Sequence, residues 1–385
     1  MTKKQKSDKI FEAYFKKKAI DLAFLKNDLE YRGHCLYFVG GCVRDALRDV
    51  QPKDYDLTTS APPDLVGAII RANNHRTVNV GLDHGTVGFF KGNEFYEITT
   101  FRQETDCDDR WKRSGFSDNL FQDSLRRDLT INALYLDFDG KLIDWHRGAE
   151  DIDKQIIRFV GDPHSRIKED HLRILRFFRF ATLFSVVNYG DYSFQAATDA
   201  CNLKGLKMIS RERIREELFK IAAAQNAKQV FQLMIENDVM ESCGVIINDQ
   251  GSFLEKLSID LLAAFASQIN SKALTDFSRS LVLSSKEKNS LSYLVRSIER
   301  NKSITDCLLD YHHYKVDRKD IIRFLQYTGK DVEIFLRLLQ HIPPYDGNYV
   351  QGKFKVSGHE VGKTLLELRK KWLEALLGAN EGLGE

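Results

Sequence analysis

The stretch "GGCVRDAL" (residues 40–47), followed closely by "DYDL" (residues 54–57), decides which fold this chain adopts. The apolar segment "LYFV" (residues 36–39) directly precedes the glycine pair, and a helix-forming segment follows it. A strand, a glycine turn and a helix in this order bring backbone N–H groups close to phosphate. We expect Gly41 and Arg44, on the first helical turn, to form a phosphate cradle.

The carboxylate pair Asp54 and Asp56 stands in a segment that predicts a strand. Because side chains alternate along a strand, both carboxylates project from one face while Tyr55 points away. Two adjacent carboxylates repel each other unless a proton or cation lies between them, and hard oxygen ligands suit Mg²⁺. An isolated Asp-x-Asp is more often a polar strand edge, but the glycine pair upstream favours a Mg²⁺ site. A neighbouring strand could add Glu97 as a third catalytic carboxylate.

Short β-rich segments alternate with helical ones between about residues 36 and 160. The segments "CLYFVG", "YDLTT", "RTVNV", "TVGFF", "EFYEITTF", "ALYLDF" and "IIRFV" predict strands, with Gly, Asp and Asn at the breaks. From about residue 162 nearly every segment has the periodicity of an amphipathic helix. The chain is therefore expected to be α+β, with an all-α second half, a boundary near "GDPHSRIKED" (residues 161–170), and Asp162 or Ser165 capping the next helix.

Composition indicates a globular protein of two or three domains: of 385 residues, 43% are hydrophobic and 29% charged. The net charge of +2 does not demand a polyanion-coating function, so any nucleic-acid surface must be local. No segment approaches the roughly 20 apolar residues of a membrane span. Six scattered cysteines suggest neither a zinc site nor a disulfide framework, and hence a reducing cytoplasm.

Five motifs, taken in order, resemble those of the class II tRNA nucleotidyltransferase and bacterial poly(A) polymerase family. They are GGxVRD (residues 40–45), DxD (54–56), "RRDLTINAL" (126–134), "EDHLRILRFFRF" (169–180) and "ERIREEL" (212–218). The segment "IDWHRGAEDI" (143–152) is similar to the family's DxxxGxxDL, with Asp144, Gly148 and Asp151 matching and Ile152 in place of leucine. The resemblance covers roughly residues 36–220.

The resemblance implies a polymerase-β-like mixed-sheet head followed by an all-α neck, body and tail. We therefore expect an N-terminal helix in residues 1–35, the nucleotidyltransferase head in 36–160, and the neck in 161–230. Residues 231–385 are expected to form the RNA-binding body and tail. The family's flexible loop corresponds to residues 102–120, where Asp108-Asp109-Arg110 stands and Asp109 replaces a glycine.

The activity implied by the resemblance is metal-dependent transfer, in which an RNA 3′-hydroxyl attacks the α-phosphate of a nucleotide and pyrophosphate leaves. Asp54 and Asp56 would hold Mg²⁺. The family analogy places further residues at the nucleotide: Gly41 and Arg44 at its phosphates, Arg127, Asp128 and Asn132 at its sugar and phosphates, and Arg176 and Arg179 at its triphosphate.

The pair Asp170 and Arg173 is expected to select the base. At positions i and i+3 these residues would be neighbours on one helix face, offering an acceptor beside a donor. Cytosine and adenine both present a donor beside an acceptor, whereas uracil and guanine present the reverse order and leave the buried groups mismatched. The simpler alternative is an i,i+3 salt bridge on a surface helix.

Full CCA addition, A-only addition, CC-only addition and poly(A) tailing all agree with these residues. We favour CCA addition to tRNA from CTP and ATP, since the loop at 102–120 appears at full length and the chain ends in "LLGANEGLGE" rather than a basic extension. A non-catalytic RNA-binding scaffold and a phosphohydrolase are the alternatives, and His312 and His313 are expected on a helix surface. No protein partner is predicted.

Overall fold

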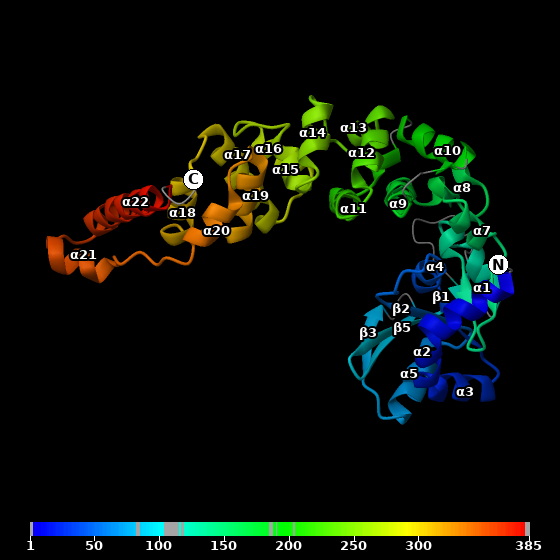
Figure 1. Cartoon of the computed structure of the whole chain (residues 1–385). Coiled ribbons are helices and arrows are strands. Elements are labelled where there is room, and N and C mark those ends of the chain that lie inside the picture. The colour runs from blue at the N-terminus through cyan, green and yellow to red at the C-terminus, as the bar shows by residue number, and fades with distance from the viewer. Residues whose placement is uncertain are drawn as a thin grey trace. The chain divides into compact units, whose positions relative to one another are not determined.

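The computed structural model describes residues 3–81, 85–103, 115–116, 119–184, 188–189, 191–202 and 205–381. The chain divides into two compact units, residues 1–208 and residues 209–385 (Figure 1). Each unit is described by itself below.

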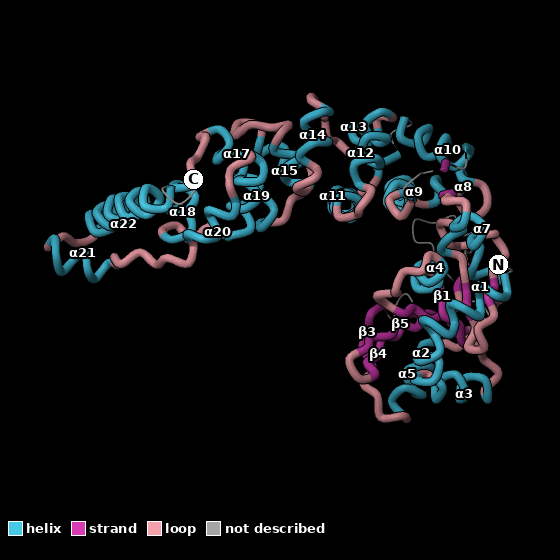
Figure 2. Tube along the Cα trace, in the orientation of Figure 1, coloured by secondary structure: helices cyan, strands magenta, loops and turns pink. Residues whose placement is uncertain are grey.

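A mixed seven-stranded sheet with the order β3-β4-β5-β2-β1-β8-β9 forms the centre of the first unit (Figure 2). Its strands are β1 (Leu36–Val39), β2 (Tyr55–Thr59), β3 (Thr77–Gly81), β4 (Thr86–Lys91), β5 (Glu94–Thr100), β8 (Tyr135–Leu136) and β9 (Leu142–Ile143). Strand β2 pairs antiparallel with β1 and parallel with β5. The α+β class and the mixed-sheet head predicted from the sequence are confirmed.

All seven predicted strand segments contain a strand, but the last lies outside this sheet. Within "IIRFV", β10 (Ile156–Ile157) pairs in parallel with β11 (Asn188–Tyr189). The expectation of a second half without strands is therefore wrong at β11, because the backbone donors and acceptors of β10 need a partner. Strands β6 (Arg102–Gln103) and β7 (Gly115–Phe116) form an antiparallel pair. The predicted Asp108-Asp109-Arg110 element between them lies outside the described residues.

The N-terminal helices cover one face of the sheet. They are α1 (Lys3–Ile10), a π-helical turn (Phe11–Phe15), α2 (Lys16–Asp21) and α3 (Ala23–Tyr31). The fully buried Phe15 packs against Phe38 and Tyr55, with ring centroids 4.9 and 5.7 Å away. The Tyr55 hydroxyl donates a hydrogen bond to the carbonyl of Tyr14 at 3.0 Å. Since Tyr55 faces this core, the alternation of β2 directs Asp56 to the other face.

The remaining helical elements of the first unit are α4 (Gly41–Leu47), α5 (Pro63–Ala72), α6 (Leu120–Leu125), α7 (Gly148–Asp153), α8 (Pro163–Glu169), α9 (Leu172–Ala181), α10 (Asp191–Asn202) and 3-10 turns at Thr130–Asn132 and Gly205–Met208. Asp162 caps α8 by accepting a hydrogen bond from the Ser165 N–H at 2.8 Å, as the sequence predicts.

The DxxxGxxD motif has a structural role in this unit. Asp144 accepts hydrogen bonds from the N–H groups of Gly148 and Ala149, at 2.8 and 3.2 Å, and so caps α7. A Cβ on Gly148 would lie 2.1 Å from the carbonyl oxygen of Thr130, so only glycine fits. Asp151, 1% exposed, accepts a hydrogen bond from the Thr130 hydroxyl at 2.6 Å.

The second unit is helical throughout its described residues. Its helices are α11 (Arg211–Ala222), α12 (Ala227–Glu236), α13 (Val239–Ser242), α14 (Gln250–Lys256), α15 (Leu261–Ala266), α16 (Leu274–Ser280), α17 (Ser285–Glu299), α18 (Ile304–His312), α19 (Arg318–Thr328), α20 (Val332–Leu338), α21 (Gly347–Phe354) and α22 (His359–Glu381). A row of aromatic rings in edge-on or tilted contact runs through α12, α14, α15 and α16, formed by Phe231, Phe253, Phe265 and Phe277. Among the described residues, every helix is too short or too polar to cross a lipid bilayer.

Candidate nucleotide site

The glycine pair shapes the turn between β1 and α4. Gly40 has φ +70°, a conformation that favours glycine, and its N–H donates to the Leu134 carbonyl at 2.9 Å. A Cβ on Gly40 would also approach the Arg127 guanidinium to 3.3 Å. Gly41 is the first residue of α4. The strand, glycine turn and helix predicted from the sequence are therefore present.

Three carboxylates gather at the strand edge beside this turn. The β2–β5 register pairs Asp56 with Glu97, and Asp54 lies two residues before Asp56. Desolvation by the surrounding protein, together with the negative charges of Glu97 and Asp54, raises the pKa of Asp56 to about 6. Arg127 and Arg44 act in the opposite direction. The Asp56 side chain is nevertheless exposed to solvent, so a ligand has access to it.

This donor set fits a hard divalent cation, since all donors are carboxylate oxygens and the two arginines only partly offset their repulsion. Among the described residues, no three His, Cys, Asp or Glu side chains are already arranged around one point as metal ligands. The chemical fit therefore rests on the desolvation of Asp56 and on the neighbouring charges of Glu97 and Asp54, which together raise the Asp56 pKa.

A chain of hydrogen bonds links four of the predicted site residues. Arg44 Nη1 donates to Asn132 Oδ1 at 2.7 Å, and Asn132 Nδ2 donates to Asp128 Oδ1 at 3.1 Å. Asp128 Oδ2 accepts from Arg176 Nε at 2.7 Å. Although burial opposes it, the Arg176 guanidinium and the Asn132 amide hold the pKa of Asp128 below its usual range. These hydrogen bonds join helix α4 to helix α9 through buried polar groups.

Three guanidinium groups lie around the Phe180 ring at the end of this chain of hydrogen bonds. The ring centroid of Phe180 lies 5.2 Å from the Arg44 guanidinium, 5.7 Å from that of Arg176 and 4.3 Å from that of Arg179. Phe180 itself is 8% exposed. Contact with one aromatic ring keeps three like charges close together, a favourable place for a polyanion.

Asp123 is a buried carboxylate that the sequence analysis missed. It accepts hydrogen bonds from Arg126 Nε at 2.8 Å, Arg127 Nη2 at 3.1 Å and the Tyr135 hydroxyl at 2.9 Å. Although burial opposes it, Arg127 and Arg126 hold the pKa of this fully buried side chain below its usual range. An acid three and four residues before two arginines was the available signal.

The junction of α8 and α9 differs from the expectation for Asp170 and Arg173. Helix α8 ends at Glu169, Asp170 is extended with φ −148°, and α9 begins at Leu172. The two residues therefore do not share one helix face. Asp170 Oδ1 instead accepts from the N–H of Leu172 at 3.0 Å, which caps the new helix.

Glu169, which was not predicted from the sequence either, forms an ion pair with Arg173 at this junction. Its carboxylate accepts from Arg166 Nη1 at 2.5 Å and from Arg173 Nη1. Arg173 Nη1 also donates to the Arg166 carbonyl at 2.7 Å. Arg166 in turn donates to the carbonyls of Arg126 and Arg127, at 2.6 and 3.0 Å. The arrangement fixes the Arg173 guanidinium while Asp170 stays at the helix start.

His312 and His313 do not both lie on the helix surface that the sequence predicts. His312, the last residue of α18, is only 8% exposed, because α22 packs over α18 and places Trp372 against its ring. The expectation is therefore wrong for His312.

Two known protein families match parts of this chain. The Poly A polymerase head domain matches residues 36–158, and the family described as "Probable RNA and SrmB- binding site of polymerase A" matches residues 195–243. The human "CCA tRNA nucleotidyltransferase 1, mitochondrial" is 32% identical over 364 residues, 88% of this chain and 83% of the relative. The "CCA-adding enzyme" of Enterococcus faecalis is 32% identical over 375 residues, 92% of this chain and 88% of the relative.

Solved structures share the fold. The Bacillus stearothermophilus CCA-adding enzyme in complex with CTP has a TM-score of 0.69 at 23% identity and covers 94% of this chain and 99% of its own. The Thermotoga maritima CCA-adding enzyme complexed with tRNA has a TM-score of 0.73 at 19% identity and covers 96% and 94%.

Proposed function

The chain belongs to the tRNA nucleotidyltransferase and poly(A) polymerase family, and from this premise we propose that it adds C and A to the 3′ end of tRNA from CTP and ATP, without a nucleic-acid template. The enzyme is a nucleotidyltransferase, and its partners are tRNA and the two nucleotides. We place the catalytic head in residues 36–160, the neck in 161–230 and the RNA-binding body and tail in 231–385.

Enzymes of this family use a divalent metal, which we propose to be Mg²⁺ held by Asp54 and Asp56, with Glu97 as the third catalytic carboxylate. The raised pKa of Asp56 supports this assignment, because three carboxylates remain mutually repulsive until a cation is bound. When bound, the metal favours the attacking alkoxide of the RNA 3′-hydroxyl and neutralises charge at the reacting phosphate. Asp54 and Asp56 would hold that metal, with Asp56 placed on the solvent-exposed face of β2 and Asp54 directly before the strand.

The guanidinium groups around Phe180 are proposed to bind the triphosphate. Arg44, Arg176 and Arg179 already lie within 5.7 Å of the Phe180 ring, so little ordering of their side chains is needed when the anion arrives. Asn132 and Asp128 position Arg44 and Arg176. The turn at Gly41 and the buried Arg127 complete the phosphate-binding set.

Base selection is proposed to depend on Asp170 and Arg173 at the α8–α9 junction. The Arg173 guanidinium offers donors, and its position is fixed by Glu169 and the Arg166 carbonyl. Asp170 offers the neighbouring acceptor from the start of α9. Cytosine and adenine satisfy this order of donor and acceptor, and uracil and guanine leave both groups mismatched.

The proposal rests on one observation. Three carboxylates at β2 and β5 occur in the same unit as an arginine network that extends into α9. The test is to incubate the protein with Mg²⁺, labelled CTP and ATP, and tRNAs that end before CCA, after C and after CC. The proposal expects all three tRNAs to end in CCA. Extension of the last tRNA alone would mean A-only addition, stalling after CC would mean CC-only addition, and long tails would mean poly(A) synthesis.

The compartment is proposed to be the cytoplasm. The free thiols of Cys35, Cys42, Cys243 and Cys307 support a reducing environment. Cell fractionation with an antibody against the chain tests this assignment, and recovery with organelles would contradict it.

A further inference from the structure

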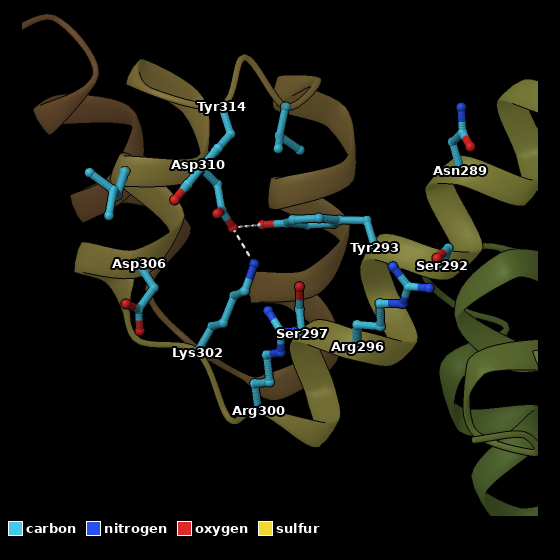
Figure 3. A pocket seen from close by; sticks show the side chains of 12 residues that line it. Asn289, Ser292, Tyr293, Arg296, Ser297, Arg300, Lys302, Asp306, Asp310 and Tyr314 are labelled. Atoms are coloured by element: carbon cyan, nitrogen blue, oxygen red, sulfur yellow. Dashed lines mark hydrogen bonds and ion pairs between the residues drawn. The ribbon is translucent and has the colours of Figure 1, made fainter. Parts of the chain in front are cut away.

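A polar pocket of about 720 Å³ opens in the second unit, between α17 and α18 (Figure 3). Its walls are the residues Asn289, Ser292, Tyr293, Arg296, Ser297, Arg300, Lys302, Asp306, Leu309, Asp310, Tyr314 and Val316. We propose that this pocket binds one phosphate-bearing nucleotide unit, the phosphate on Arg296 and Arg300 and the base on Tyr314. The proposal rests on the proposed function only for the identity of the RNA used in the test.

The acidic residues of the pocket already have hydrogen-bond partners. Lys302 Nζ lies 2.6 Å from Asp310 Oδ2, and the Tyr293 hydroxyl donates to the same oxygen at 2.8 Å, as Figure 3 shows. Asp306 is the third residue of α18 and completes a capping box with the N-cap Ser303, accepting from the Ser303 N–H and hydroxyl at 2.9 and 2.8 Å. Asp310 is therefore paired with Lys302, and Asp306 keeps its charge at the start of α18, so the three cationic side chains of the pocket exceed its two carboxylates by one.

The two arginines are left with excess positive charge. Arg296 and Arg300 stand four residues apart on one face at the end of α17, where like charges destabilise a helix. Among the described residues, neither guanidinium forms an ion pair within 4.0 Å, and Glu299, which stands between them in α17, accepts a hydrogen bond from the N–H of Ser271 at 2.8 Å. A phosphate would relieve the repulsion and accept hydrogen bonds from both guanidinium groups.

The opposite wall offers an aromatic ring. Tyr314 is 57% exposed, and its ring is supported edge-on by His313, with centroids 4.7 Å apart. An exposed tyrosine on one wall and cationic side chains on the other suit a single nucleotide, because any base can stack on the ring while the phosphate is held by cations. The cavity volume is within the range of small-ligand pockets.

The test measures the affinity of the full-length protein for a tRNA that lacks CCA, without nucleotide, between 50 and 300 mM KCl. Arg296→Gln/Arg300→Gln is expected to weaken binding roughly 5- to 8-fold at 0.1 M salt and to reduce the slope of log affinity against log salt by about 0.7 to 0.9, because one phosphate contact is lost. The matched control is Lys286→Gln/Lys288→Gln, which removes two charges from α17 outside the pocket. Tyr314→Ala is expected to weaken binding about 5-fold or more, and Tyr314→Phe to retain it.

A second arm identifies the source of the phosphate. Equilibrium dialysis with labelled ATP gives the number of nucleotides bound per chain. A loss of one bound ATP in Arg296→Gln/Arg300→Gln, with tRNA affinity unchanged, assigns the pocket to free nucleotide and also supports the proposal. If both measurements match those of the lysine control, the proposal is wrong. Neither arm depends on nucleotide incorporation, so failure of CCA addition would not affect them.

Discussion

Arg176 of helix α9 donates a hydrogen bond from Nε to Oδ2 of Asp128 at 2.7 Å, and this bond joins the head motif to the helix that follows it. The same carboxylate accepts from Asn132 and from the N–H of Leu129. A side chain that is 8% exposed thus meets three donors. Its charge is stabilised by the interactions that place Arg176 and, through Asn132, Arg44.

Replacing Asp128 by Asn should therefore destabilise the first unit and weaken nucleotide binding. The amide keeps the volume, but Arg176 loses its anionic partner, and we expect a loss of about 1 to 3 kcal/mol in the free energy of unfolding. Urea unfolding and the KM for ATP measure the two effects. Asp139→Asn, at an exposed acid of the same unit, is the control. A stability equal to that of the control would show that the Asp128 charge is not needed.

Arg173→Ala should relax discrimination against UTP and GTP, because the donor of the base-selecting pair is lost. Glu169→Gln should give a smaller loss of discrimination, since Glu169 contacts Arg173 and keeps its guanidinium in place. Incorporation of each of the four nucleotides, one at a time, measures the ratios. Unchanged selectivity in Arg173→Ala would remove this residue from base selection.

Gly148→Ala should unfold or strongly destabilise the first unit. The added Cβ would lie 2.1 Å from the Thr130 carbonyl oxygen, which is backbone and cannot move aside cheaply. We expect a loss of more than about 3 kcal/mol by overpacking. The control is Gly67→Ala in α5, where only the far end of the Arg71 side chain must shift. Equal thermal midpoints for the two variants would contradict the expected clash.

Because His312 is buried, we expect the second unit to become less stable at acid pH. Burial, aided by the charges of Lys315 and Arg369, lowers the pKa of His312 below its ordinary value near 6.5. The unfolded chain then binds more protons than the folded one, so this contribution to stability is complete above pH 6.5 and is lost as the pH falls below it. Calorimetry of His312→Leu should show a flatter pH dependence, by up to about 1.4 kcal/mol per pH unit. The exposed His341→Leu should behave as wild type, and a flattened profile there would refute the assignment.

Local pattern predicted much of the head. The strand segments, the glycine turn and the exposed face of β2 that carries Asp56 depend on period-two alternation and on residues within a few positions of each other, whereas Asp54 lies just before the strand and its predicted shared face stays a prediction. The side chains that contact Arg127 and Arg173 could not be predicted from local pattern. Asp123 accepts a hydrogen bond from Tyr135 on β8, and Phe180 contacts Arg44, which lies far away in sequence.

The helix break at Asp170 had no local signal. The segment "KEDHLRI" contains neither proline nor glycine, and its periodicity continues across the break. The break exists because Asp170 caps the Leu172 N–H while Arg166 holds α8 against the carbonyls of Arg126 and Arg127. Such a competition between a local cap and a long-range contact is not contained in a single sequence window.

The central claim, that Asp54 and Asp56 support the chemistry of nucleotide transfer, is tested by single-turnover addition of labelled AMP to a tRNA ending in CC. We expect Asp54→Asn and Asp56→Asn each to lower the rate about 1,000-fold or more, because the metal supplies several kcal/mol of charge stabilisation. The affinity of both variants for tRNA should remain within about 2-fold of wild type, since the loss of one negative charge does not weaken RNA binding. A rate near that of the wild type in either variant would contradict the claim.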